Sequence, residues 1–261
     1  LLDSVVEGPS TFYAQLALRE MKEVAVASLA DEMWRGDARR RIVALDLLLG
    51  ICQPELDGFT AGRIRKMLHE DTSGLARGVA VRCCTAGFFL EEAAPILLEC
   101  LTACSSAERL AFPVAGTFRV RPLAAEALGS YMRHEGLLPA LIEAAEDEDE
   151  EVAAAALCSL ARSWDIAESR ARLLSLCESC TSARRAIAIR ALGHVPNSEP
   201  AVVDRCLAAI SQGDAKLATA GLDALERQWI WARVFDDHSA SAGLGHADSR
   251  VRMLAIENCV E

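Results

Sequence analysis

Aromatic residues are scarce in this sequence. They make up 5% of its 261 residues, whereas hydrophobic residues of all kinds make up 52%. Ala, Leu and Val must therefore do most of the packing, and small side chains suit close contact between helices. Proline is also rare, and most of the 8 prolines and 16 glycines lie between apolar segments. This distribution is typical of helices joined by short turns.

Long apolar runs and an excess of basic residues are both missing. No uncharged apolar run reaches the roughly 18 residues that a membrane-spanning helix needs, and no secretory leader is visible. The net charge is −11, which disfavours nucleic-acid binding and favours a basic partner. The sequence starts at Leu1 without Met and stops at Glu261 inside a predicted helix, so we expect it to be part of a longer protein.

The ten cysteines follow no disulfide framework. Most fall on apolar helical faces, where a free cysteine acts as a small hydrophobic residue. A helical chain of this size needs no disulfides, so we predict a reducing compartment, the cytoplasm. Cys177 and Cys180 have the spacing of a metal or redox pair, but no second such pair exists, and they end a predicted helix instead of starting one. We therefore predict core or turn cysteines, with no metal and no cofactor.

A motif recurs seven times along the chain: a short polar stretch, a charged pair and an Ala- and Leu-rich helix that often ends in Gly. Equivalent helix ends lie 32 to 42 residues apart, a period typical of solenoids. The pattern predicts an all-α fold, a right-handed α-α superhelix of about seven helix pairs that forms a single domain over 1–261. The predicted pairs are roughly 9–52, 53–89, 90–133, 134–164, 165–195, 196–229 and 230–261.

Within each pair, the residues at the second helix have predictable structural roles. An acidic residue before the helix can accept its first free N–H groups. An Arg one turn in can reach carbonyl or acidic groups of its own or the preceding repeat, and a final Gly supplies a left-handed cap. The longest irregular stretch is predicted between the helices of the third pair, at Ser105–Thr117.

These helix pairs resemble HEAT repeats, most clearly in the second half of the chain. Short HEAT variants read Asp-x-Asp-x-x-Val-Arg before an Ala-rich helix, and Asp147–Ala153 follows this pattern except for Ala at its last position. Arg121, Arg185 and Arg252 occupy the Arg position elsewhere. The resemblance covers nearly the whole chain and implies a non-catalytic scaffold that binds another protein.

HEAT-like enzymes are the alternative class. Deoxyhypusine hydroxylase binds iron through several His-Glu pairs, but here only His69-Glu70 and His134-Glu135 occur, out of phase with the repeats. Bilin lyases share the short HEAT pattern, and nothing in the sequence separates them from a scaffold. Alkylpurine DNA glycosylases place aromatics and a carboxylate on a basic face; Trp34 and Trp164 resemble such aromatics, although filling helix junctions is the simpler role for them.

The acidic run Glu146–Glu151 has two interpretations. It is either a landing patch for a basic partner or a turn whose charge favours the start of the next helix. No calcium-binding loop spacing is present in it.

In HEAT-like arrays the second helices line the concave side, where partners bind. The predicted contacts there are Arg39, Arg40, Arg77, Arg82, Arg119, Arg190, Lys216, Asp223 and Arg227. The apolar stretch Phe112, Pro113 and Val114 is a second candidate contact, with packing against its own repeat as the alternative.

Overall fold

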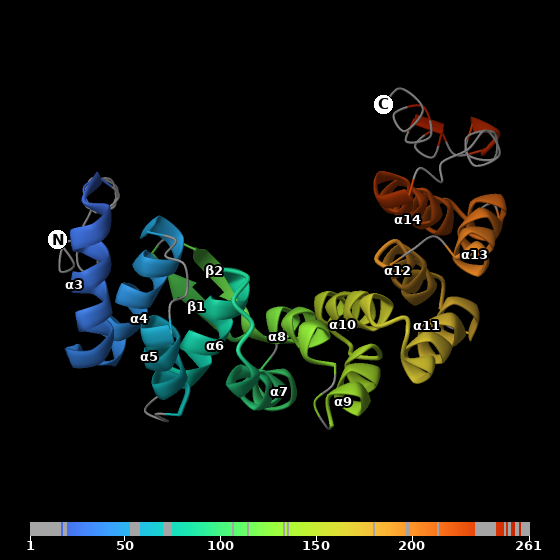
Figure 1. The fold of residues 1–261 in the computed structure, drawn as a ribbon. Coiled ribbons are helices and arrows are strands. Elements are labelled where there is room, and N and C mark those ends of the chain that lie inside the picture. Colours follow the sequence, from blue (N-terminus) through green and yellow to red (C-terminus); the bar gives the residue numbers. More distant parts are fainter. Residues whose placement is uncertain are drawn as a thin grey trace. The chain divides into compact units, whose positions relative to one another are not determined.

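In this computed structural model the chain forms two compact units, residues 1–134 and 135–261 (Figure 1). The structure describes residues 17, 20–52, 58–69, 75–105, 107–113, 115–132, 134, 136–179, 181–196, 199–212, 214–232, 244–247, 249, 252–253 and 256. Twelve α-helices lie in this part of the chain and pack in pairs. The all-α prediction is therefore confirmed.

The first unit contains three helix pairs, each with a first helix against a second. These are α3 (Lys22–Arg35) with α4 (Ala38–Leu47), α5 (Gly58–His69) with α6 (Leu75–Thr85), and α7 (Ala94–Ala103) with α8 (Val120–Leu128). Short helical turns extend three of them, at Leu48–Cys52, Glu91–Ala93 and Gly129–Tyr131. The second helices α4, α6 and α8 also pack successively on one another.

The stretch predicted to be irregular contains a two-stranded antiparallel hairpin, β1 (Arg109–Phe112) and β2 (Gly116–Arg119). Phe112 and Phe118 face each other with ring centroids 6.1 Å apart. The backbone N–H of Ala115 donates to Asp46 Oδ1 at 3.3 Å, which fastens the hairpin to α4. Leu110 and Phe112 are two residues apart on β1, which is the spacing of a strand, and Phe118 of β2 pairs with Leu110. A segment this short is hard to distinguish from a loop by sequence.

The second unit repeats the arrangement of paired helices. Its pairs are α9 (Leu137–Ala144) with α10 (Glu150–Arg162), α11 (Ala167–Ser179) with α12 (Ser182–Leu192), and α13 (Pro200–Ser211) with α14 (Ala215–Ala232). Here too the second helices α10, α12 and α14 pack in succession. Pro200 begins α13, where its missing N–H removes no helical hydrogen bond.

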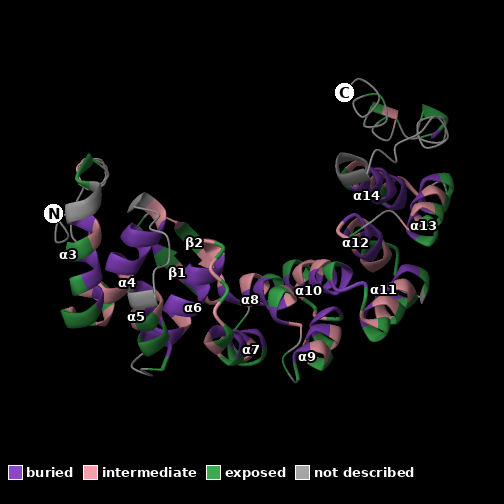
Figure 2. Cartoon of the chain, in the orientation of Figure 1, coloured by how far each residue is buried: buried purple, intermediate pink, exposed green. Residues whose placement is uncertain are grey.

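The core lies between the helices of each pair and between successive second helices, as the buried residues in Figure 2 show. It is built mainly from Leu, Ala and Val, as the scarcity of aromatics predicts. Leu45, Val79 and Leu128 in the first unit and Leu157, Leu192 and Leu222 in the second are fully buried.

Acidic residues cap three of the second helices, α4, α10 and α14, as the sequence predicts, whereas the N-caps of α8 and α12 are Arg119 and Thr181 and make no side-chain cap hydrogen bond. Asp37 Oδ1 accepts the backbone N–H of Arg40 at 2.9 Å, and Asp149 Oδ1 accepts that of Glu151 at 3.1 Å. Asp214 Oδ1 accepts the N–H of Lys216 at 2.8 Å. Each bond satisfies an N–H that has no partner inside the helix.

The predicted reach of the repeat arginines to carbonyl groups is also confirmed. Three second-helix arginines donate Nε to a carbonyl in the last turn of the first helix of the same pair, where helical partners are lacking. The bonds join Arg41 to Met33 at 2.9 Å, Arg121 to Leu101 at 3.0 Å and Arg185 to Cys177 at 3.0 Å. We call these three bonds the arginine latches. Arg252 likewise donates to the carbonyl of His246, at 2.8 Å.

The predicted role of the closing glycines is only partly right. Gly87 is left-handed, with φ of 79°, but Gly129 and Gly193 have φ of −56° and −61°. A Cβ on Gly193 would lie 3.0 Å from both Cα and O of Ala224 in α14. The small residue at this position therefore permits close approach of two helices and does not reverse the chain.

The last predicted boundary, between 196–229 and 230–261, is displaced. Helix α14 continues to Ala232 and so includes the start of the first helix predicted for the seventh pair, 230–237. Residues 233–243 lie outside the described part. The single-domain range and the seven repeat ranges stay predictions.

Candidate partner-binding groove

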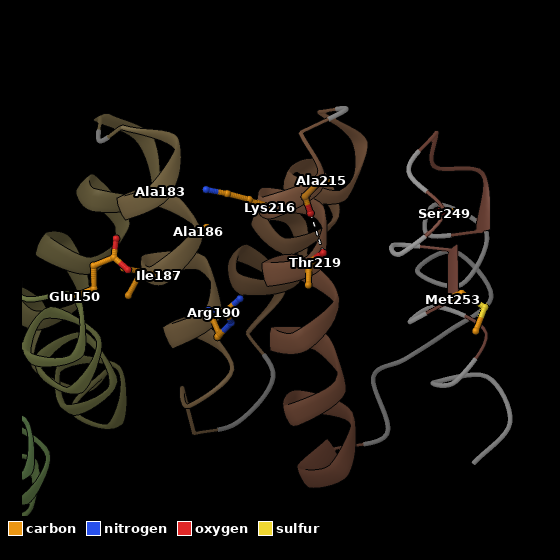
Figure 3. Close-up of a pocket in the computed structure, with 10 residues that line it drawn as sticks. All are labelled: Glu150, Ala183, Ala186, Ile187, Arg190, Ala215, Lys216, Thr219, Ser249 and Met253. Carbon is orange, nitrogen blue, oxygen red and sulfur yellow. Dashed lines mark hydrogen bonds between the residues drawn. The ribbon is translucent and has the colours of Figure 1, made fainter. Parts of the chain in front are cut away.

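A groove of about 680 Å³ lies on the second unit, along its second helices (Figure 3). It is lined by Glu150 of α10, by Ala183, Ala186, Ile187 and Arg190 of α12, by Ala215, Lys216 and Thr219 of α14, and by Ser249 and Met253. In Figure 3 Glu150 lies at the α10 side, and Ser249 and Met253 lie at the opposite side.

Small residues line much of the groove. Ala183, Ala186 and Ala215 leave the helix surfaces open where longer side chains would fill the space. Met253 is 56% exposed and Ile187 is half-buried, so the groove offers apolar surface to solvent. Thr219 Oγ1 donates to the carbonyl of Ala215 at 2.8 Å and is thereby directed along its own helix.

The groove carries charges of both signs. Glu150 is exposed in the first turn of α10, directly after the acidic turn Glu146–Asp149. Lys216 is exposed in the first turn of α14, and in Figure 3 its side chain extends toward α12. Arg190 donates Nε to Asp223 Oδ2 at 2.8 Å, with the two side chains 43% and 26% exposed.

The start of α14 is held by its N-cap. Ser182 Oγ donates to the Asp214 carboxylate, and the backbone N–H groups of Lys216 and Leu217 donate to it as well. These hydrogen bonds, that of Ser182 first, lower the pKa of Asp214 below its ordinary value. Because Ser182 begins α12, the bond also ties the starts of α12 and α14 together beside Lys216.

The negative charge of the chain is concentrated in the second unit. Residues 135–261 contain 12 Lys and Arg against 21 Asp and Glu, a net charge of −9. Residues 1–134 contain 15 against 17, a net charge of −2. The groove and its two exposed basic side chains therefore lie on the strongly acidic unit.

Of the predicted contacts in this unit, Arg190 and Lys216 line the groove, and Asp223 is the ion-pair partner of Arg190. Arg227 is exposed, and its guanidinium donates to His194 Nε2.

The predicted contacts of the first unit differ in exposure. Arg39 is exposed and Arg40 half-buried in the first turn of α4. Arg77 is half-buried in an ion pair with Glu108, with Nη1 3.1 Å from Oε1. Arg119, expected on a second helix, is the last residue of β2 and the N-cap of α8.

The structure removes Arg82 from the predicted contact surface. Its side chain is 4% exposed, and its Nε donates to Asp46 Oδ1 at 2.6 Å. Its Nη2 donates to the carbonyl of Asp46 at 3.2 Å. A guanidinium enclosed in this way has no surface for a partner.

Phe112 packs within the protein and is not a partner contact, because it is 5% exposed and contacts Phe118. Pro113 is exposed, and Val114 lies outside the described residues.

Sequence reasoning named two of the ten groove residues, Arg190 and Lys216, as contacts, and Glu150 lies in the acidic run that was weighed as a landing patch. The other seven, Ile187 and Met253 among them, were missed. The available signal was position, since Glu150, Ala183 and Lys216 all lie in the first turn of their second helices. Residues at equivalent repeat positions become neighbours when the repeats stack.

The cysteines that the structure describes carry no sign of a reactive site. Cys177 is buried, and Cys180 lies outside the described part. Burial raises the pKa of Cys83 and Cys100 to about 12, which disfavours the reactive thiolate. No group of His, Cys, Asp or Glu able to hold a metal ion occurs among the described residues.

The tryptophans differ from each other. Trp164 is 3% exposed and buried in the second unit, as predicted. Trp34 is 47% exposed, so its predicted role in filling a helix junction is wrong. The Lys66 ammonium lies 3.7 Å from the centroid of its ring, a cation–π contact between α3 and α5.

Comparison with known proteins agrees with this architecture. The sequence model of the family described as HEAT repeats matches residues 116–193. Residues 116–193 are thus similar to HEAT repeats, and the described helices form an all-α, HEAT-like solenoid. Within the described part, none of the helices combines the length and the apolar character needed to cross a membrane.

Two crystal structures, each described as an engineered protein, match this chain. One has a TM-score of 0.51 and 17% sequence identity, with 98% of this chain and 76% of that chain covered. The other has a TM-score of 0.39 and 16% identity, with 89% and 95% covered. No curated protein matches the sequence.

Proposed function

We propose that the protein is a non-catalytic interaction scaffold that binds a segment of a partner protein in the groove along α10, α12 and α14. The observation that carries the proposal is the groove itself: about 680 Å³ of open space over small and apolar residues, with charged side chains at its edges. Partner sites on proteins combine an apolar centre with a polar rim in the same way. HEAT repeats commonly mediate protein interactions.

Enzyme chemistry receives less support from the groove. The acidic charge of the unit opposes a nucleic-acid substrate. The free, buried cysteines suit a reducing compartment, so the cytoplasm is the proposed location.

The test is a comparison of three baits in a pull-down from a lysate of the source cells. Ile187→Asp places a charge on the half-buried groove floor, and Ile166→Asp places the same charge at a half-buried position beside α11. We expect a partner protein captured by the wild type and by Ile166→Asp to be lost with Ile187→Asp. Circular dichroism should show equal helicity for the three proteins.

Two outcomes would contradict the proposal. Capture that is unaffected by Ile187→Asp would place the interface outside the groove. Nucleic acid or an absorbing chromophore in the eluate, without a partner protein, would favour a HEAT-like enzyme.

A further inference from the structure

The groove has an acidic residue at its α10 side and a basic residue further along it, on α14, which sets the chemistry of what it can hold. Glu150 is exposed at the α10 side and follows four consecutive acidic residues, Glu146–Asp149. Lys216 is exposed on α14, and Arg190 lies on α12 between them. Ile187 and Met253 supply the exposed apolar surface.

The two opposite charges differ in how far the protein itself neutralises them. Arg190 is paired with Asp223 at 2.8 Å, so a partner gains less from it. The carboxylate of Asp214 lies near Lys216, but it is already occupied by the Ser182 hydroxyl and by two backbone N–H groups. Glu150 and Lys216 are therefore the two groove charges best placed for charges on a partner.

The geometry points to a partner segment with one basic residue, an apolar residue and one acidic residue. This inference rests on the proposed function. The basic residue pairs with Glu150, the apolar residue packs over Ile187 on α12, and the acidic residue pairs with Lys216 on α14. A partner segment with only basic residues would be repelled by Lys216. One with only acidic residues would be repelled by Glu150 and by the acidic turn beside it.

The spacing follows from helix packing. Adjacent helix axes lie about 8–10 Å apart, so α10 and α14, with α12 between them, are roughly 16–20 Å apart. An extended chain rises about 3.3 Å per residue, and the side chains reach inward, so the two charged residues of the segment lie about three to six positions apart.

A random-peptide library displayed on phage tests this chemistry directly. Peptides selected on the wild type should have an apolar residue between one basic and one acidic residue, with a net charge near zero. Glu150→Lys should select peptides with two acidic residues, and Lys216→Glu should select peptides with two basic residues. Each reversal should weaken binding of a wild-type-selected peptide by about three- to tenfold, the range expected for an exposed ion pair turned into a repulsion.

Matched controls lie on α11, outside the groove. Glu168 is exposed in the first turn of its helix, as Glu150 is, and Arg170 follows two residues later. Glu168→Lys and Arg170→Glu change the net charge of the protein as the two groove variants do, and should leave the selected peptides unchanged.

The outcomes separate this inference from the proposed function. If Ile187→Asp abolishes selection but the charge of the peptides does not follow Glu150→Lys and Lys216→Glu, the groove binds a segment without the charge preference. If Ile187→Asp selects the same peptides as the wild type, the groove is not the site and both proposals fail. Selection of no peptides by the wild type would overturn the inference.

Discussion

At the scale of single residues, arginines with similar sequence contexts have different roles. Arg82 and Arg77 lie on the same helix, yet Arg82 is buried against Asp46 and Arg77 is half-buried against Glu108. The repeat pattern predicted two of the three latch arginines, Arg121 and Arg185, because their position within the helix pair is fixed, but it did not single out Arg41. It could not predict the burial of Arg82, since the partner Asp46 lies 36 residues earlier and in another pair.

Removal of Arg82 should destabilise the first unit strongly. Arg82→Ala removes the guanidinium that neutralises the buried Asp46 carboxylate, and we expect a loss of about 3–5 kcal/mol. The double variant Arg82→Met with Asp46→Leu should be less destabilised than Arg82→Ala, because no charge stays buried. Urea unfolding followed by circular dichroism measures both.

The control for this prediction is an ion pair at the surface of the same unit. Arg35 and Asp31 are 76% and 54% exposed and 3.8 Å apart. Arg35→Ala should therefore cost less than about 1 kcal/mol. Equal effects of Arg35→Ala and Arg82→Ala would mean that water reaches Asp46.

At the scale of helices, apolar periodicity and acidic caps predicted most of the elements. Sequence reasoning failed where an element depends on a contact that is distant in the chain. The hairpin β1–β2 is held partly by Asp46 of α4, and Gly193 is small because α14 passes close to it. The sequence has a glycine after α6, Gly87, and another after α12, Gly193. It does not show that a left-handed turn requires the first and a neighbouring helix the second.

Gly221 in α14 provides a test of such a close approach. A Cβ at this position would lie 2.7 Å from the backbone O of Cys206 in α13. Gly221→Ala should therefore force the two helices apart and cost about 1–3 kcal/mol, although alanine favours a helix by about 1 kcal/mol. Gly62 in α5 has no atom within 4 Å of such a Cβ, so Gly62→Ala should stabilise the protein by about 0.5–1 kcal/mol.

Thermal unfolding of the two glycine variants measures these effects on stability. Opposite shifts in the midpoint temperature are expected. A stabilising effect of both substitutions would show that α13 and α14 separate at little cost.

At the scale of the whole molecule, the repeat period was sufficient to predict a solenoid, but not the groove. Groove residues come from four segments between Glu150 and Met253. Their proximity arises from the stacking of α10, α12 and α14, and helix boundaries predicted to within a few residues do not fix which side chains meet. The net charge of the whole chain likewise does not show that the two units differ, with net charges of −2 and −9.

This difference predicts that salt acts unequally on the two units. Repulsion among like charges opposes folding and is screened when ionic strength rises. Raising NaCl from about 0.05 M to about 0.5 M shortens the screening length from roughly 14 to 4 Å. Hydrogen exchange measured by mass spectrometry should show a larger gain in protection in α9–α14 than in α3–α8. An equal gain in both would mean that local ion pairs already balance the acidic charge.

The arginine latches have a consequence for how such a chain can lengthen. Donor and acceptor lie in the same helix pair, as with Arg41 and Met33 or Arg185 and Cys177. A gene duplication that copies one pair therefore copies both halves of its fastening, and the new unit arrives with its two helices already joined. Only its outer contacts with the flanking pairs then have to adapt.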